Sequence, residues 1–118
     1  MKKNILKEKS FAFAIKIIQL YPVLSLNRRE YILSKQVLRS GTSIGAMIRE
    51  AQNAESKADF VHKLAISQKE CDESLYWLEL LYQSGFLIED EFQVLHYDAS
   101  ELLKMIRSAI LTSKSNTR

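Results

Sequence analysis

The sequence contains few residues that interrupt helices, with three glycines and one proline among 118 residues. Its single cysteine, Cys71, excludes an internal disulfide and favours a reducing compartment. Apolar residues make up 47% of the chain and charged residues 26%. A chain of this length can bury one core without a metal ion or a disulfide, so we predict a single all-α domain over residues 1–118.

The chain also lacks a clear secretion signal and a long apolar run. A basic start precedes the apolar segment 11–20, but Lys16 and Gln19 interrupt that segment and no small-x-small cleavage site follows before Pro22. No stretch approaches the ~18 consecutive apolar residues that cross a bilayer. We therefore expect a cytoplasmic protein with no membrane partner.

No group of residues predicts catalysis. A di-metal site in a helical bundle takes two Glu-x-x-His pairs, whereas this chain offers only Asp59 before His62, and Gln93 stands three residues before His96. His62 and Cys71 lie nine residues apart on one expected helix, too far for a hydrogen-bonded base and nucleophile. The sequence therefore predicts no enzyme, no metal site and no cofactor.

Apolar residues that recur at three- and four-residue steps predict helices over about residues 6–21, 27–54, 57–84 and 89–111. The apolar face expected for the first helix consists of Phe11, Ala14, Ile15, Ile18 and Tyr21. Pro22 is expected to end that helix, because the residue before a proline is disfavoured in α geometry. Short connections make neighbouring helices antiparallel, which predicts an antiparallel up-down-up-down four-helix bundle.

Two helix ends carry local signals. Ser56, three residues before Asp59, has the spacing of a capping box, so we expect Ser56 to be the N-cap of the third helix. Gly85, followed by Phe86, fits a left-handed C-cap with a trailing hydrophobic contact.

Gly41 and Gly45 lie within the expected second helix, where each glycine costs about 1 kcal/mol relative to alanine. They are one turn apart on the same face, so a neighbouring helix can approach closely there. We predict that this close contact recovers the cost.

Charge is divided between the two halves of the chain. Residues 1–69 carry 13 Lys/Arg and 5 Asp/Glu (+8), and residues 70–118 carry 4 and 9 (−5). The expected second helix contains five basic candidates for phosphate contacts, namely Arg28, Arg29, Lys35, Arg39 and Arg49. RNA phosphate or the acidic half of another subunit could supply their counter-charge, and a plain solvated face is the alternative.

Aromatic residues are concentrated in the third helix. Tyr76, Trp77 and Tyr82 could stack on bases, but at helical spacing such residues more often belong to a core or an interface. We therefore interpret them as candidates for a subunit interface.

One combination of motifs resembles a known family. The motif in the second helix consists of Arg39, Ser40, Ser43, Ile44, Ile48 and Glu50, in the same stretch as Gly41 and Gly45. The motifs of the third helix are Ser56-Lys57, Asp59-Phe60, Lys63-Leu64-Ala65-Ile66, Tyr76-Trp77-Leu78, Leu80-Leu81 and Ser84-Gly85. Together they resemble the four-helix bundle proteins of the 23S rRNA intervening-sequence type, also called S23 ribosomal proteins. The similarity extends from about Phe11 to Ile110, and the chain has Met47 where the family commonly has Asn.

The resemblance implies a small bacterial protein that assembles into a ring of five subunits. Some members are encoded within insertions in ribosomal RNA genes, and a related branch binds reverse transcriptase and RNA as an accessory protein. Two functions follow as hypotheses. The first is an RNA-associated protein that uses the five basic residues, and the second is an oligomeric scaffold or accessory protein that binds a protein partner and no RNA.

Overall fold

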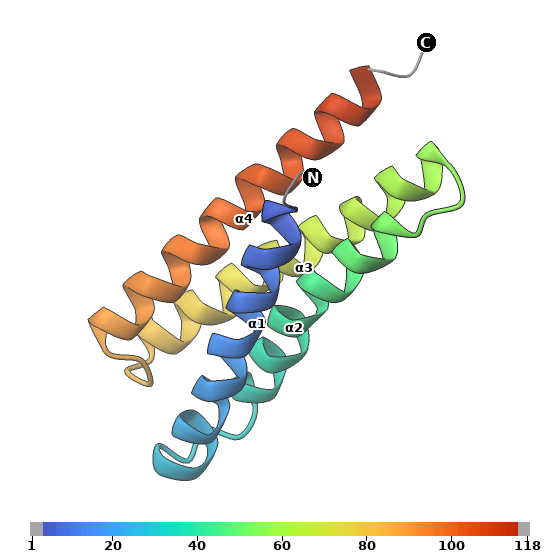
Figure 1. Cartoon of the computed structure of the whole chain (residues 1–118). Helices are drawn as coiled ribbons and strands as arrows, with labels where there is room; N and C mark the ends of the chain where they lie inside the picture. The colour runs from blue at the N-terminus through green and yellow to red at the C-terminus, as the bar shows by residue number, and fades with distance from the viewer. Residues whose placement is uncertain (1–3, 116–118) are drawn as a thin grey trace.

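The computed structural model describes residues 4–115 (Figure 1). It contains four α-helices, α1 (Ile5–Pro22), α2 (Leu33–Gln52), α3 (Lys57–Gln83) and α4 (Glu89–Ser115), and a π-helix, η1 (Val23–Asn27), that continues α1. Successive α-helices run in opposite directions, and the molecule measures 51 × 26 × 20 Å (Figure 1). The all-α bundle predicted from the sequence is confirmed.

All four helices contribute to one apolar core. The largest fully buried side chains are Phe13, Ile17, Leu24, Val37, Ile44, Ile48, Leu64, Cys71, Leu78, Leu81, Leu102 and Ile106. The contact of α2 with α3 is the most extensive in the bundle, and that of α1 with α4 is the smallest among the neighbouring α-helices. The seam between α1 and α4 is therefore the least extensive of the bundle.

The face predicted for the first helix is wrong. Phe13, Ile17 and Leu20 are buried, whereas Phe11, Ile15 and Ile18 are exposed. The sequence of α1 is apolar around most of its circumference, so its periodicity does not select one side. The expectation that no stretch is long and apolar enough to cross a bilayer is also corrected: by length and composition the segment Ile5–Asn27 is, and 33% of its most apolar window is buried in the bundle.

The connection between α1 and α2 also differs from the prediction. Pro22 does not end the helical path, because it is the last residue of α1 and η1 continues to Asn27. The second helix was expected from residue 27 but begins at Leu33, and Arg29 adopts a positive φ of 57° in the bend.

Glu30 fixes the start of α2. Its carboxylate is buried and accepts hydrogen bonds from the backbone N–H groups of Leu33 at 3.0 Å and Ser34 at 2.6 Å. The N-cap position itself is Ile32, which has no side-chain acceptor. Glu30 therefore satisfies orphan donors that the N-cap residue cannot satisfy.

The two predicted caps are confirmed. Ser56 precedes α3, and its hydroxyl accepts a hydrogen bond from the backbone N–H of Asp59 at 3.0 Å. At the other end, Gly85 has a φ of +83°, and the Phe86 N–H donates to the Leu81 carbonyl at 2.8 Å. That geometry is a Schellman ending, which needs no further tertiary contact.

Candidate interaction surfaces

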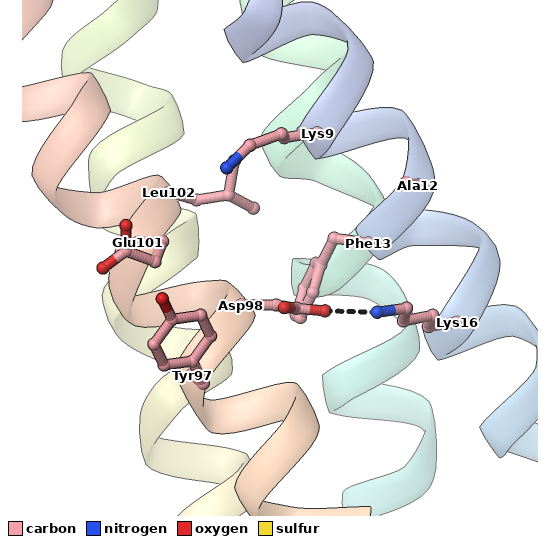
Figure 2. A pocket seen from close by; sticks show the side chains of 8 residues that line it. All are labelled: Lys9, Ala12, Phe13, Lys16, Tyr97, Asp98, Glu101 and Leu102. Carbon is pink, nitrogen blue, oxygen red and sulfur yellow. Dashed lines mark hydrogen bonds and ion pairs between the residues drawn. The ribbon is translucent and has the colours of Figure 1, made fainter.

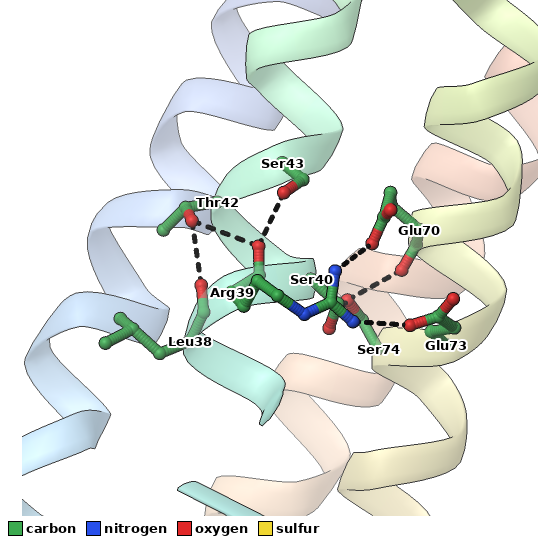
Figure 3. A network of polar contacts seen from close by, with 8 residues as sticks. All are labelled: Leu38, Arg39, Ser40, Thr42, Ser43, Glu70, Glu73 and Ser74. Atoms are coloured by element: carbon green, nitrogen blue, oxygen red, sulfur yellow. Dashed lines mark hydrogen bonds and ion pairs between the residues drawn. The ribbon is translucent and has the colours of Figure 1, made fainter. Parts of the chain in front are cut away.

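Arg39 lies at the centre of a polar network between α2 and α3 (Figure 3). Its guanidinium donates to Glu73 at 2.6 Å and to Glu70 at 3.0 Å. Hydrogen bonds to Glu73 and then Glu70 raise the pKa of Arg39. Beneath this pair, the hydroxyls of the buried residues Ser40 and Ser74 lie 2.8 Å apart. Arg39 therefore has its counter-charge within its own chain.

Arg28 does not belong to the helix on which the sequence placed it, because it lies in the bend before α2. Its guanidinium donates to both carboxylate oxygens of Glu91, at 2.7 and 2.9 Å, and to the Phe86 carbonyl at 2.9 Å. The hydrogen bond to Glu91 raises the pKa of Arg28, and the same bond lowers the pKa of Glu91. The pair joins the α1–α2 bend to the start of α4.

The other three basic candidates are exposed and form no ion pair within residues 4–115. Arg29 is in the bend, and Lys35 and Arg49 lie near opposite ends of α2, about 21 Å apart along the helix axis. The five basic residues predicted as phosphate contacts are thus divided into two that form internal ion pairs and three separated cations.

Gly41 and Gly45 lie where α2 crosses α1. A Cβ atom at Gly41 would lie 2.9 Å from Ile17 Cγ1, and one at Gly45 would lie 3.3 Å from Ser10 Oγ. Two other residues of the same motif contact α3. The Ile44 carbonyl accepts a hydrogen bond from Ser67 at 2.9 Å, and Glu50 pairs with Lys63 at 3.1 Å. Ser43 instead donates back to the Arg39 carbonyl at 2.7 Å.

The three aromatic candidates for an interface do not form one surface. Tyr82 stacks on Phe92 with ring centroids 4.3 Å apart, and Trp77 is half-buried. The indole N–H of Trp77 is enclosed, with no hydrogen-bond partner in the described part of the chain. Of these three residues, only Tyr76 is exposed, with its ring centroid 5.2 Å from that of Trp77.

A small depression lies between α1 and α4 (Figure 2). It has a volume of about 180 Å³ and the buried ring of Phe13 beneath it. Lys16 bridges its edge to Asp98 at 2.6 Å, and Tyr97 stands on the α4 side. The bridge joins the two helices with the smallest mutual contact.

Chemically reactive groups are sparse. Within residues 4–115, no three His, Cys, Asp or Glu side chains are grouped to hold a metal ion. Cys71 is buried, and desolvation raises the pKa of its thiol to about 12. His96 lies 3.0 Å from Glu79 and bridges α4 to α3. These contacts explain packing and give no arrangement of nucleophile and base.

The surface that sequence reasoning missed is apolar. Phe11 and Ile18 on α1 are 52% and 53% exposed, and Ile15 lies between them along the helix. Two further large residues, Leu26 and Ile32, are exposed in the connection to α2. The available signal was that α1 carries apolar residues around its circumference. When such a helix is buried on one side only, the apolar residues on its other sides stay exposed.

The pattern of the 23S rRNA-intervening sequence protein family matches residues 2–108. The chain belongs to this family. A solved structure from Bacteroides thetaiotaomicron, described as a protein of unknown function from the S23 ribosomal protein family, is 45% identical with a TM-score of 0.89. The match covers 90% of this chain and 98% of that chain. A comparison with curated proteins gives no match. The resemblance inferred from the motifs is therefore confirmed.

Proposed function

We propose that this member of the 23S rRNA-intervening sequence protein family is a non-catalytic assembly protein whose copies form a closed homo-oligomer. The observation that supports it is the set of large apolar side chains left exposed on α1 and in the α1–α2 connection. Grouped apolar side chains at a surface mark interaction sites, and their burial supplies the free energy of association. The family resemblance sets the expected number of subunits at five.

The internal ion pairs of Arg28 and Arg39 favour this function over one based on phosphate contacts. A phosphate would have to replace carboxylates that these guanidinium groups already contact. We also propose that the assembly is cytoplasmic and requires neither a membrane nor a metal ion. Chelation should leave the thermal midpoint unchanged, because a metal bound only by the folded state would stabilise that state.

Light scattering of the purified protein at moderate salt tests the proposal. A ring of five subunits has a mass of about 68 kDa, five times the 13.6 kDa of one chain. A concentration-independent mass of 13.6 kDa would refute self-assembly. A mass corresponding to another number of subunits would keep the assembly function and reject the number five.

RNA association is a second candidate, which the family description and three exposed cations support. Arg29, Lys35 and Arg49 carry positive charge and form no ion pair within residues 4–115. A ring would repeat this set of cations once per subunit. Binding of this kind weakens steeply as salt increases. No detectable binding to a 23S rRNA fragment at 50 mM salt would leave a protein partner as the alternative.

A further inference from the structure

A groove lies on the outer seam between α1 and α2, on the surface that α3 and α4 do not cover. Phe11 and Ile18 form its α1 wall, and the small residues Ala14, Gly45 and Ala46 also line it. The close helix approach at the glycines places this shallow apolar floor beside large exposed residues. The groove has a volume of about 240 Å³. A dry cavity of about 150 Å³ holds a benzene ring, so one aromatic side chain can enter this groove.

The ends of this groove are basic. Lys7 and Arg49 lie at one end, where the Arg49 guanidinium is 5.3 Å from the centroid of the Phe11 ring. Neither side chain forms an ion pair within residues 4–115. Toward the other end, Lys35 is exposed on α2, fourteen residues before Arg49 and on the same helical face. An occupant with acidic ends and an apolar centre would satisfy both features.

The exposed face of α4 has that pattern. Val94 and Tyr97 are 52% and 66% exposed, and they lie between Asp90 and Glu101 at steps of four, three and four residues. These four residues, named the α4 stripe, share one helix face about 16 Å long. Asp90 forms no ion pair within residues 4–115, and Glu101 has only a 3.7 Å contact with Lys104.

The chain's own α4 cannot supply the occupant. Lys16 and Phe13 face α4 across the depression of Figure 2, whereas Phe11 and Ile18 project from a different side of α1. A stripe that enters the groove must therefore come from another copy. Such a contact joins unlike surfaces, so it leaves a free stripe on one subunit and a free groove on the other for the next neighbours.

We infer that the α1–α2 groove binds the α4 stripe of a second copy of this chain, with the Tyr97 ring on the apolar floor. The inference rests on the proposed self-assembly and assigns its two surfaces. α3 offers a poorer occupant, because Glu79, the acid one turn beyond its exposed Tyr76, already contacts His96. Burial of the ring supplies affinity, and the charged ends set orientation.

Two variants and two matched controls test this assignment. Ala46→Glu places an acid on the groove floor, and Tyr97→Glu removes the ring from the stripe. Ala65→Glu and Tyr76→Glu make the same changes at exposed positions of α3, outside both surfaces. All four positions are exposed and helical, and glutamate is a good helix former, so each variant keeps its fold. Circular dichroism checks that each helical content equals that of the wild type.

Light scattering at one fixed concentration then gives the mass of each protein. Ala46→Glu and Tyr97→Glu should each associate at least tenfold more weakly and run at 13.6 kDa, whereas both controls keep the wild-type mass. An equimolar mixture of Ala46→Glu and Tyr97→Glu should give a 1:1 dimer of about 27 kDa. In this mixture the intact stripe of one variant meets the intact groove of the other, and the remaining two altered surfaces repel each other.

The outcomes separate the two proposals. A monomeric wild type would reject self-assembly itself. If the wild type is oligomeric and either groove or stripe variant keeps its mass, self-assembly stands and the assigned surfaces are wrong. A mixture that stays at 13.6 kDa would overturn the head-to-tail contact. Loss of assembly in Tyr76→Glu would show that α3 supplies the occupant of the groove and would reject the α4 assignment.

Discussion

Gly41 and Gly45 allow a matched test of the close packing between α1 and α2. They are the same residue type one turn apart in one helix, but a new methyl group meets different neighbours. A Cβ at Gly41 would lie 2.9 and 3.1 Å from the two γ carbons of Ile17, which is fully buried. A Cβ at Gly45 would meet the Ser10 hydroxyl at 3.3 Å. A hydroxyl can shift by a few tenths of an ångström more easily than a packed isoleucine.

The two alanine variants should therefore change stability in opposite directions. Replacing a helix-interior glycine with alanine gains about 1 kcal/mol of helix propensity at either position. Overpacking against Ile17 costs about 1–3 kcal/mol at Gly41 alone. We expect Gly45→Ala to raise the free energy of unfolding by up to about 1 kcal/mol, and Gly41→Ala to be less stable than Gly45→Ala by about 1–3 kcal/mol.

Urea denaturation followed by circular dichroism measures this difference. With an m value of about 1–3 kcal/mol per molar urea, the two midpoints should be separated by about 1 M. Both proteins are compared at one concentration, because self-association would add to apparent stability. Equal midpoints would show that α1 does not approach Gly41 closely.

A third variant distinguishes steric overlap from other causes. Ile17→Ala removes both γ carbons and costs about 2–5 kcal/mol by itself. In that background, Gly41→Ala should become stabilising, because the two close γ carbons are gone and the remaining Cβ of residue 17 lies at an ordinary contact distance of 3.4 Å. A destabilisation unchanged by Ile17→Ala would place the conflict with the backbone and refute the role assigned to Ile17.

Three further predictions concern charged and reactive groups. Because burial raises the pKa of Cys71 to about 12, the native thiol should resist a thiol reagent at pH 8 and react rapidly in urea; rapid labelling of the native protein would contradict its burial. Arg28 lowers the pKa of Glu91, so their pair stabilises the fold above the unfolded carboxyl pKa of about 4.3 and loses this effect as pH falls. The urea midpoint of Arg28→Met should therefore fall less between pH 6 and pH 3 than that of the wild type. A pH profile identical to that of the wild type would reject the linkage. If RNA binds, Arg29→Gly should reduce the slope of log affinity against log salt concentration by about 0.7–0.9, whereas Arg39→Ala should leave this slope nearly unchanged. Glycine is chosen at position 29 because it tolerates the positive φ there. The opposite order would show that phosphate displaces the carboxylates at Arg39.

Local sequence chemistry predicted the parts of the fold that depend on neighbouring residues. Ser56 and Gly85 were assigned correctly because a cap needs only the residues within one turn of it. The start of α4 at Glu89 agrees with the predicted boundary for the same reason. In these places, backbone hydrogen bonds and the favoured φ of single residues determine the structure.

The α1–α2 connection was predicted wrongly because its structure depends on tertiary contacts. A buried Glu30 at the start of α2 does not match the usual N-cap residues, and its role depends on the bend made by Arg29. Pro22 remains in the helix because its missing N–H is tolerated where α1 passes into η1. No local pattern distinguishes this arrangement from a continuous second helix.

Charge partners were the least predictable feature, since their register is set by packing between helices. The sequence showed a basic first half and an acidic second half, and it suggested a partner outside the chain. Arg39 instead pairs with Glu70 and Glu73, more than thirty residues away. Only the crossing of α2 over α3 brings these groups together, so sequence periodicity gave the sign of the charge and not the partner.

The internal pairs give the charge division a different meaning. The basic helices α1 and α2 form one hairpin, the acidic helices α3 and α4 form the other, and ion pairs cross both seams between them, at Lys16–Asp98 and at Arg39 with Glu70. Partly exposed pairs each contribute about 0–1 kcal/mol, too little to hold the hairpins together without the apolar core. Their effect is selective, because two basic hairpins from different copies repel while a basic and an acidic hairpin attract. The division therefore favours the correct pairing of hairpins during folding. In the proposed assembly, Lys7 and Arg49, which form no ion pair within residues 4–115, would act in the same way between subunits.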